Sequence, residues 1–410
     1  MENTERAHDL VIYGATGFVG ELIAAYVAEH APAGLRVGIA GRSRSKLEAV
    51  RSRLPAAARE WSLIEADSED AGSLTALAES TRVLFTTVGP YVKYGLPVVE
   101  SCARAGTHYG DLTGEVSFVR DAIDRCDDLA KASGARIVHA CGYDSVPSDL
   151  AVLLLHRAAE ADDAGALTDV QLVATAKGGV SGGTVDSMRG QLDGARSDPA
   201  LKSLAGDPYA LSPDRAAEPS TDQPADYGPV SRSTNGLWTA PFVMAAGNTR
   251  IVRRSNALQG WAYGRSLSYG EVMGISSGPA GAVVARIIAV GLKIFMGAMA
   301  VPLTRRLLDR VLPAPGKGPS REAQEAGWFR STVTARTERG RRYRATVKAP
   351  GDPGYTATAV MAGETALSLA LDGDRLPPVS GSLTPATALG DVLVERLRAA
   401  GHTYEVTRLT

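Results

Sequence analysis

Residues 9–46 place the strongest constraint on the fold of this 410-residue chain. The segment has the pattern of a short apolar strand, a turn with three glycines, a helix and a second strand. The glycines are Gly14, Gly17 and Gly20. The first two let the backbone turn tightly and approach a pyrophosphate, and the third lets the strand pack closely against the helix. This pattern predicts a cradle for a dinucleotide, and the alternative is a tight turn without a ligand.

The end of the second strand indicates which dinucleotide is bound. Sites for NAD usually have Asp or Glu there, which accepts from the ribose 2′-hydroxyl and would repel a 2′-phosphate. This chain has Gly41-Arg42-Ser43-Arg44-Ser45-Lys46 instead, which offers a guanidinium, hydroxyls and further positive charge. NADPH is therefore the predicted cofactor, and the alternative is a solvated basic helix start. The predicted cofactor-binding residues are Gly14, Thr16, Gly17, Phe18, Val19, Gly20, Arg42, Ser43, Lys46, Asp67, Val88, Gly89 and Pro90.

Strand and helix patterns alternate through residue 150. This alternation predicts an α/β fold with a Rossmann-type doubly wound parallel sheet, in which ligands bind beyond the carboxyl ends of the strands. A different pattern follows and predicts a second α/β domain with a mixed or antiparallel sheet. The expected strands of the first sheet lie at 9–13, 35–40, 61–65, 83–87, 107–110 and 136–140.

The expected organisation is an NADP-binding domain over 1–150, a substrate domain over 151–382, and a C-terminal helix and strand over 383–410 that return to the first domain. Within the second domain, residues 195–235 are rich in Pro, Asp, Ser and Ala and lack apolar periodicity, which predicts a long surface loop. Near the C-terminus, Pro385 suits the first turn of a helix and Gly401 its stop. One helix is therefore expected at 386–400.

Residues 279–311 form the most apolar stretch. Arg286 and Lys293 interrupt it, so it contains no run of about 18 uncharged apolar residues to span a bilayer. Because these cations are seven residues apart, they share one helix face. We favour a helix packed in a core or a dimer interface. The alternative is an interfacial helix that lies on a membrane or covers an apolar pocket.

The composition bears on partners and compartment. The formal net charge of −1 gives no field that would draw the chain to nucleic acid. Its three cysteines lack disulfide and metal spacing, and the N-terminus lacks the pattern of an export signal. We therefore expect no metal and a cytoplasmic protein that binds a small molecule or another protein. An interfacial helix would add peripheral contact with the inner face of the plasma membrane.

Several segments, in order, resemble the saccharopine dehydrogenase family, and in particular its branch of trans-acting enoyl reductases. The resemblance spans nearly the whole chain, and the ordered set is far more specific than the first segment alone. The segments are Tyr13-Gly-Ala-Thr-Gly-Phe-Val-Gly20, Ala40-Gly-Arg-Ser43, Thr86-Thr-Val-Gly-Pro-Tyr91, Tyr94-Gly-Leu-Pro97, Asp111-Leu-Thr-Gly-Glu115, His139-Ala-Cys-Gly-Tyr-Asp-Ser-Val-Pro-Ser-Asp149, Ser181-Gly-Gly-Thr184 and Leu383-Thr-Pro-Ala-Thr-Ala-Leu-Gly390.

The resemblance implies a nucleotide-binding domain with an inserted α/β domain whose sheet faces the cofactor. It also implies NADPH-dependent reduction of a carbon–carbon double bond in an acyl chain of polyketide or lipid synthesis, carried by a synthase that lacks its own reductase. Two alternatives stay open. One is an amino-acid oxidoreductase like saccharopine dehydrogenase, which needs several cations to hold carboxylates. The other is an NADP-binding protein without turnover that is attached to a lipid surface.

Reduction of an enoyl thioester needs a hydride at the β-carbon, a donor to the thioester oxygen and a proton for the α-carbon. The catalytic candidates are Tyr91, Tyr94, Tyr143 and Asp144, in loops expected to face the crevice, where packing and helix capping are the alternative roles. The substrate-binding candidates from the second domain are Lys177, Ser181, Gly182, Gly183 and Thr184. The lysine would meet an anionic group, and the glycines would admit an acyl chain or simply form a tight turn. A homodimer is a further expectation.

Overall fold

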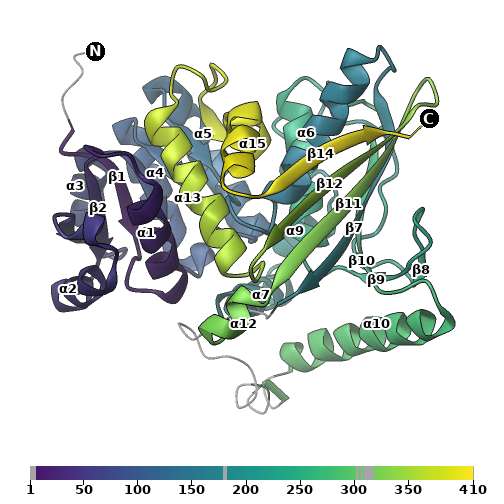
Figure 1. The fold of residues 1–410 in the computed structure, drawn as a ribbon, viewed down its shortest axis with the longest axis horizontal. Helices are drawn as coiled ribbons and strands as arrows, with labels where there is room; N and C mark the ends of the chain where they lie inside the picture. Colours follow the sequence, from purple (N-terminus) through teal and green to yellow (C-terminus); the bar gives the residue numbers. More distant parts are fainter. Residues whose placement is uncertain (1–5, 179–181, 302–303, 306–307, 309–317, 410) are drawn as a thin grey trace.

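The computed structural model describes residues 6–178, 182–301, 304–305, 308 and 318–409, which form two seven-stranded sheets with surrounding helices (Figure 1). All neighbouring strands of sheet A are parallel. Its order, β13-β6-β5-β4-β1-β2-β3, is the Rossmann arrangement with one strand added, which confirms the predicted fold class. Its strands are β1 (His8–Tyr13), β2 (Val37–Gly41), β3 (Ser62–Glu65), β4 (Thr81–Thr86), β5 (His108–Gly110), β6 (Arg136–Val138) and β13 (Gly381–Leu383).

Helices cover both faces of sheet A, so its central strands are apolar on both sides. Leu10 and Ile12 of β1 belong to one buried cluster, while Val11 and Tyr13 belong to the cluster on the opposite face. The strands predicted for this sheet end within two residues of the observed ones. The helices of this domain are α1 (Phe18–His30), α2 (Arg44–Arg53), α3 (Ala71–Ser80), α4 (Tyr91–Ala105), α5 (Val116–Ser133), α13 (Thr356–Leu371) and α15 (Gly390–Ala399), with a 3-10 turn at Ala56–Ala58.

Sheet B has the order β14-β12-β11-β7-β10-β9-β8 and is mixed, because β7 and β10 run parallel and the other neighbours antiparallel. This confirms the predicted second sheet. Its strands are β7 (Leu167–Lys177), β8 (Ser231–Arg232), β9 (Trp238–Pro241), β10 (Ser268–Gly274), β11 (Trp328–Thr337), β12 (Arg342–Pro350) and β14 (Thr403–Arg408). The remaining helices are α6 (Val146–Ala161), α7 (Gly182–Ser197), α8 (Pro199–Gly206), α9 (Ala245–Leu258), α10 (Pro279–Ala300), α12 (Arg321–Glu325) and α14 (Pro385–Ala388).

The C-terminal part departs from expectation in three ways. The return to the first domain begins with α13, well before 383, because this helix packs beside α1 (Figure 1), where the Tyr26 hydroxyl donates to Glu364 at 2.5 Å. The final strand β14 does not return there, since it pairs with β12 in sheet B. The helix expected at 386–400 is two helices, α14 and α15, because the chain turns at Leu389 and Gly390, the first residue of α15, adopts a φ of +54°.

Residues 195–235 do not form the expected open surface loop throughout. Asp198 caps α8 by accepting from the Ala200 amide at 2.8 Å, and residues 209–211 beyond this helix are buried. Arginines of α9 donate to backbone carbonyls of this stretch, as Arg254 does to Leu211 at 2.6 Å. The segment therefore packs through irregular backbone, which leaves no apolar periodicity in the sequence.

Helix α10 ends at Ala300, and the rest of the expected 279–311 helix falls largely outside the described residues. Only 17% of its apolar window is buried, so the interpretation as a core helix is wrong. Among the described residues it is the one helix long and apolar enough to cross a membrane by length and composition, with a mean hydropathy of 1.9.

Candidate active site

The turn after β1 has the geometry of a dinucleotide cradle. Gly14 adopts a φ of +88°, and a Cβ at Gly20 would lie 2.3 Å from the Gly14 carbonyl oxygen. Gly17 precedes α1 without a side-chain cap, so amide N–H groups at this helix N-terminus point toward an anion site. These observations fit the pyrophosphate of a bound nucleotide. Thr16 lies exposed at the tip of the turn, and Val88 lies against Gly14.

Replacing Gly20 with alanine will disrupt this cradle. The added methyl group would force β1 and α1 apart, so we expect the free energy of unfolding to fall by about 1–3 kcal/mol and NADPH affinity to fall about tenfold to hundredfold. Denaturant unfolding and a nucleotide titration measure the two effects. Gly373→Ala is the matched control, because no atom lies within 4 Å of a Cβ there. If the Gly20 variant bound NADPH as tightly as the wild type, this turn would not be part of the nucleotide site.

The adenosine end of the cradle lies beyond β2 and β3. Arg42 is exposed directly after β2 and, among the described residues, has no ion-pair or hydrogen-bond partner, which suits a guanidinium that awaits a phosphate. Ser43 caps α2 by accepting from the Lys46 amide at 3.4 Å, and Lys46 is itself exposed. Burial raises the pKa of the Tyr13 phenol, and the charge of Asp67, which stands after β3, adds to that rise.

Lys93 is a second cation at this end that sequence reasoning missed. Its hydrogen bond with Tyr94 raises the pKa of Lys93, while repulsion from Arg42 opposes that rise. Arg42, from the loop after β2, and Lys93, from α4, therefore both act on this end of the site. Their positive charges together would favour a 2′-phosphate there.

A cavity of about 470 Å³ joins the cradle to the second domain. This volume lies within the range of small-molecule sites. Its first-domain wall is lined by Gly17, Phe18, Val19, Gly20, Thr87, Gly89, Pro90, Tyr91, Leu112, Gly114, Gly142 and Asp144. Its opposite wall includes Met188 and Leu192 of α7, Met244 beside α9 and Met296 of α10. The cavity thus leads from the expected cofactor position into an apolar chamber.

No lysine, arginine or histidine is among the described residues that line this cavity. The nearby arginines of α9 are buried and already have partners within the protein. Arg253 donates to the Tyr269 carbonyl at 2.8 Å, and Arg250 forms an ion pair with Asp226. A substrate with two or more carboxylates would find no counter-charge among these described lining residues. The described lining suits a neutral, largely apolar substrate.

Asp144 is the one carboxylic acid among the described residues that line the cavity. It lies in the loop between β6 and α6, and no other described residue forms a hydrogen bond or ion pair with it. Burial raises the pKa of Asp144 to about 7, because desolvation disfavours the charged carboxylate. A carboxyl group whose pKa is raised in this way can both hold and release a proton near neutral pH, which suits a general acid or base.

The tyrosine candidates are placed differently. The Tyr91 ring lines the cavity, but its hydroxyl donates to the Thr86 carbonyl and accepts from the Leu112 amide, each at 3.2 Å. Tyr94 and Tyr143 do not line it: Tyr94 carries the Lys93 ammonium 4.6 Å from its ring centroid, and Tyr143 packs against a phenylalanine of sheet B. The geometry therefore favours Asp144 over these three phenols.

Glu115, which sequence reasoning did not single out, joins the two domains beside the cavity. Its carboxylate accepts from the amides of Tyr91 at 3.2 Å and Val92 at 2.7 Å, at the N-terminus of α4. It also accepts from the Ser187 hydroxyl of α7 at 2.6 Å. Burial raises the pKa of Glu115, while these hydrogen bonds oppose the shift. This residue therefore links the N-terminus of α4 to the second-domain wall of the cavity.

The substrate-binding candidates find little support. Lys177 is exposed at the end of β7 and does not line the cavity. Ser181 lies outside the described residues. Gly182, Gly183 and Thr184 begin α7, but the surroundings of these three residues are not described. The wall comes instead from the following turns of this helix, whose expected position and apolar spacing could have identified Met188 and Leu192.

Other lining residues come from distant parts of the chain and could not be read from local patterns. Asn248 of α9 accepts from the Ser145 hydroxyl at 3.2 Å and donates to Glu271 at 2.8 Å. Tyr355, just before α13, packs its ring on Phe18 at a centroid distance of 5.2 Å. Burial raises the pKa of the Tyr355 phenol, so it stays protonated.

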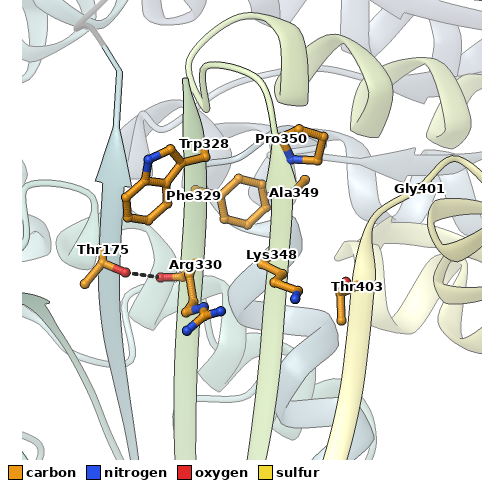
Figure 2. Close-up of a pocket in the computed structure, with 9 residues that line it drawn as sticks. All are labelled: Thr175, Trp328, Phe329, Arg330, Lys348, Ala349, Pro350, Gly401 and Thr403. Carbon is orange, nitrogen blue, oxygen red and sulfur yellow. Dashed lines mark hydrogen bonds between the residues drawn. The ribbon is translucent and has the colours of Figure 1, made fainter. Parts of the chain in front are cut away.

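A second cavity, of about 600 Å³, crosses β7, β11, β12 and β14 on sheet B (Figure 2). Figure 2 shows Arg330 and Lys348 on adjacent strands, with Trp328 and Phe329 above them. The described residues that line it are all different from those that line the cradle cavity. It lies outside the nucleotide site, and we assign it no part in the chemistry.

Comparisons with known proteins agree with this geometry. Residues 10–138 match the family model of the saccharopine dehydrogenase NADP binding domain. A trans-acting enoyl reductase of Mycobacterium tuberculosis is 44% identical and one of Mycobacterium ulcerans 42% identical, each over 100% of both chains. Saccharopine dehydrogenase (L-Glu forming) of Saccharomyces cerevisiae superposes with a TM-score of 0.55 at 13% identity, covering 98% of this chain and 99% of that one. This last likeness shows the shared fold.

Proposed function

Because this chain belongs to the trans-acting enoyl reductases of the saccharopine dehydrogenase family, we propose that it reduces the conjugated double bond of an acyl thioester. It is an NADP-dependent oxidoreductase. The observation that carries the proposal is the cavity itself, which runs from the cradle into an apolar chamber whose described lining has one carboxyl group and no cation. An enoyl chain is neutral and apolar, and its reduction consumes one proton.

The cradle residues and the Arg42 region would hold NADPH, which supplies a hydride to the β-carbon when bound. Asp144 then donates its proton to the α-carbon, so the double bond gains one hydride and one proton in total. The resulting carboxylate recovers a proton from water through the cavity. The raised pKa of Asp144 makes the proton available near neutral pH.

The Tyr355 hydroxyl is the group that we assign to the thioester oxygen. It lies at the cradle end of the cavity beside Phe18, and no other described residue accepts its proton. A phenol donor there would stabilise the negative charge that develops on the oxygen as the hydride adds. Tyr355→Phe is the variant that removes only this donor.

The relatives are named trans-acting, a word that describes action with a separate synthase. For this chain we infer that the acyl group arrives on a carrier of a separate polyketide or lipid synthase. The alternative function is that of an amino-acid oxidoreductase. The lack of cations among the described lining residues disfavours it.

The proposal is tested by NADPH oxidation with two substrate classes. We expect turnover with 2-enoyl thioesters of pantetheine, which mimic a carrier-bound chain, and none with glutamate and 2-aminoadipate 6-semialdehyde, the substrates of an L-Glu-forming saccharopine dehydrogenase in the reductive direction. Turnover of only the second pair of substrates would show that the protein is an amino-acid oxidoreductase. Binding of NADPH without oxidation by any enoyl thioester would favour a protein without this activity.

A bulkier side chain in the α7 wall will shorten the chamber. Ala195 lines the cavity, so Ala195→Phe fills part of the space for an acyl chain. We expect KM to rise about tenfold for a long-chain enoyl thioester, with little change for a four-carbon one. The short substrate serves as the internal control, measured in the same steady-state assay. An equal effect on both lengths would place the chain elsewhere.

A further inference from the structure

Helix α10 presents an apolar stripe to solvent. Val283, Ile287, Val290 and Ile294 are 55%, 64%, 55% and 66% exposed. Their spacing of three and four residues places them on one face of the helix. Large exposed side chains concentrated in this way mark an interaction surface.

The opposite side of α10 is bound to the protein. It packs against β9 and α7, and Ala285 and Met299 on this side are fully buried. Met296 reaches the wall of the substrate cavity. Figure 1 shows the helix as a rod along the periphery, below β8, β9 and β10 in that view. The same helix therefore separates the cavity from whatever covers the stripe.

The charges on α10 indicate the occupant. Arg286 and Lys293 are exposed along one flank of the stripe, and residues 279–300 contain no Asp or Glu. A basic flank beside an apolar stripe complements anionic headgroups above acyl chains. A dimer is a poorer fit. If two copies of α10 paired in antiparallel fashion about a two-fold axis between these cations, each cation would face a cation of the second copy, and no acidic residue of the helix would separate them.

A bilayer-spanning placement also conflicts with these positions. Arg286 and Lys293 each lie about 5 Å along the axis from the midpoint of the helix, so both would sit near the bilayer centre. Contact with β9 and α7 also holds one side of the helix on the protein. Both facts favour a helix that lies in the plane of the surface.

We propose that α10 docks the protein on an anionic lipid surface, with its apolar stripe in the headgroup layer and its inner side forming the wall of the cavity. An acyl chain held in that layer would then lie one helix diameter from the chamber. The docking does not depend on the proposed enoyl reduction, because it rests on α10 alone.

Flotation of the full-length protein with vesicles tests this surface. We expect it to float with phosphatidylcholine vesicles that contain phosphatidylglycerol and to bind vesicles of phosphatidylcholine alone more weakly. Ile287→Ser with Ile294→Ser should lower the affinity at least about tenfold. Arg286→Gln with Lys293→Gln should lower the affinity for the anionic vesicles about thirtyfold. The matched control is Leu371→Ser with Val379→Ser, two exposed hydrophobic residues elsewhere, which should bind like the wild type.

Hydrogen exchange and light scattering test the same surface independently. Hydrogen exchange of the wild-type protein with anionic vesicles should show new protection confined to peptides from 279–300, which requires no variant to fold. Equal binding to both vesicle types, or no binding, would overturn the proposal. So would light scattering that shows a dimer which the isoleucine variant converts to a monomer, since the stripe would then join two copies. NADPH affinity, measured on each variant, separates these results from a failure of the cofactor assignment.

Discussion

Replacing Asp144 with asparagine will lower kcat for enoyl reduction by about 10²–10⁴-fold, the usual contribution of a positioned general acid. The change keeps the size of the side chain but removes the proton that we assign to the α-carbon. We expect the dissociation constant for NADPH to stay unchanged, because Asp144 is not part of the cradle. Steady-state kinetics with an enoyl thioester and a nucleotide titration measure the two quantities.

The dependence of kcat on pH provides a second test of Asp144 as the proton donor. The raised pKa means that Asp144 is protonated below about pH 7 and ionised above it. As a proton donor it should therefore support full kcat on the acid side, with a tenfold fall for each unit above this pKa. The Asp144→Asn variant should lose this limb. A variant that kept both the rate and the limb would eliminate Asp144 as the donor.

Asp149→Asn is the matched control. Burial also raises the pKa of Asp149 to about 7, but this carboxylate accepts from the Ser255 hydroxyl at 2.5 Å and the Ala386 amide at 2.8 Å, away from the cavity. Its replacement should lower the thermal stability and leave the pH limb of kcat in place. Loss of the limb in this variant would mean that the profile reports stability.

Replacing Arg42 with aspartate will reverse the cofactor preference. A carboxylate there would repel the 2′-phosphate, so we expect NADPH affinity to fall by about 10²–10³-fold. NADH affinity should hold or rise, since aspartate can accept from the ribose 2′-hydroxyl. Titration of both nucleotides measures the change in their ratio.

Arg53→Asp is the control for this change, because Arg53 lies at the far end of α2 in an exposed pair with Glu21 at 2.7 Å. It should leave both affinities nearly unchanged. If the Arg42 variant bound NADPH as tightly as the wild type, the 2′-phosphate would be held elsewhere. Lys93, the neighbouring cation, would then be the next residue to replace.

The cradle and the first sheet were predictable because their signals are local. Gly14, Gly17 and Gly20 lie within seven residues, and alternating strands and helices suffice to predict a doubly wound sheet. The hairpin of β11 and β12 likewise shows period-two alternation in the sequence. Such features need no knowledge of distant partners.

The features that could not be predicted from the sequence depend on contacts between distant segments. The placement of α13 depends on its packing with α1, and the burial of residues 209–211 depends on arginines of α9. A tyrosine in a crevice loop does not reveal where its hydroxyl points, and Tyr91 directs it to backbone groups. Exposure of α10 was also hidden, because an apolar helix has the same sequence pattern in a core and on a surface.

The most direct test of the central claim follows the hydride into the product. NADPH with deuterium at the transferable position is given with a 2-enoyl thioester in ordinary water, and the saturated product is analysed by mass spectrometry and NMR. We expect one deuterium on the β-carbon and a solvent-derived proton on the α-carbon. Deuterium on the former carbonyl carbon, or no transfer to any enoyl thioester by a protein that binds NADPH, would contradict it.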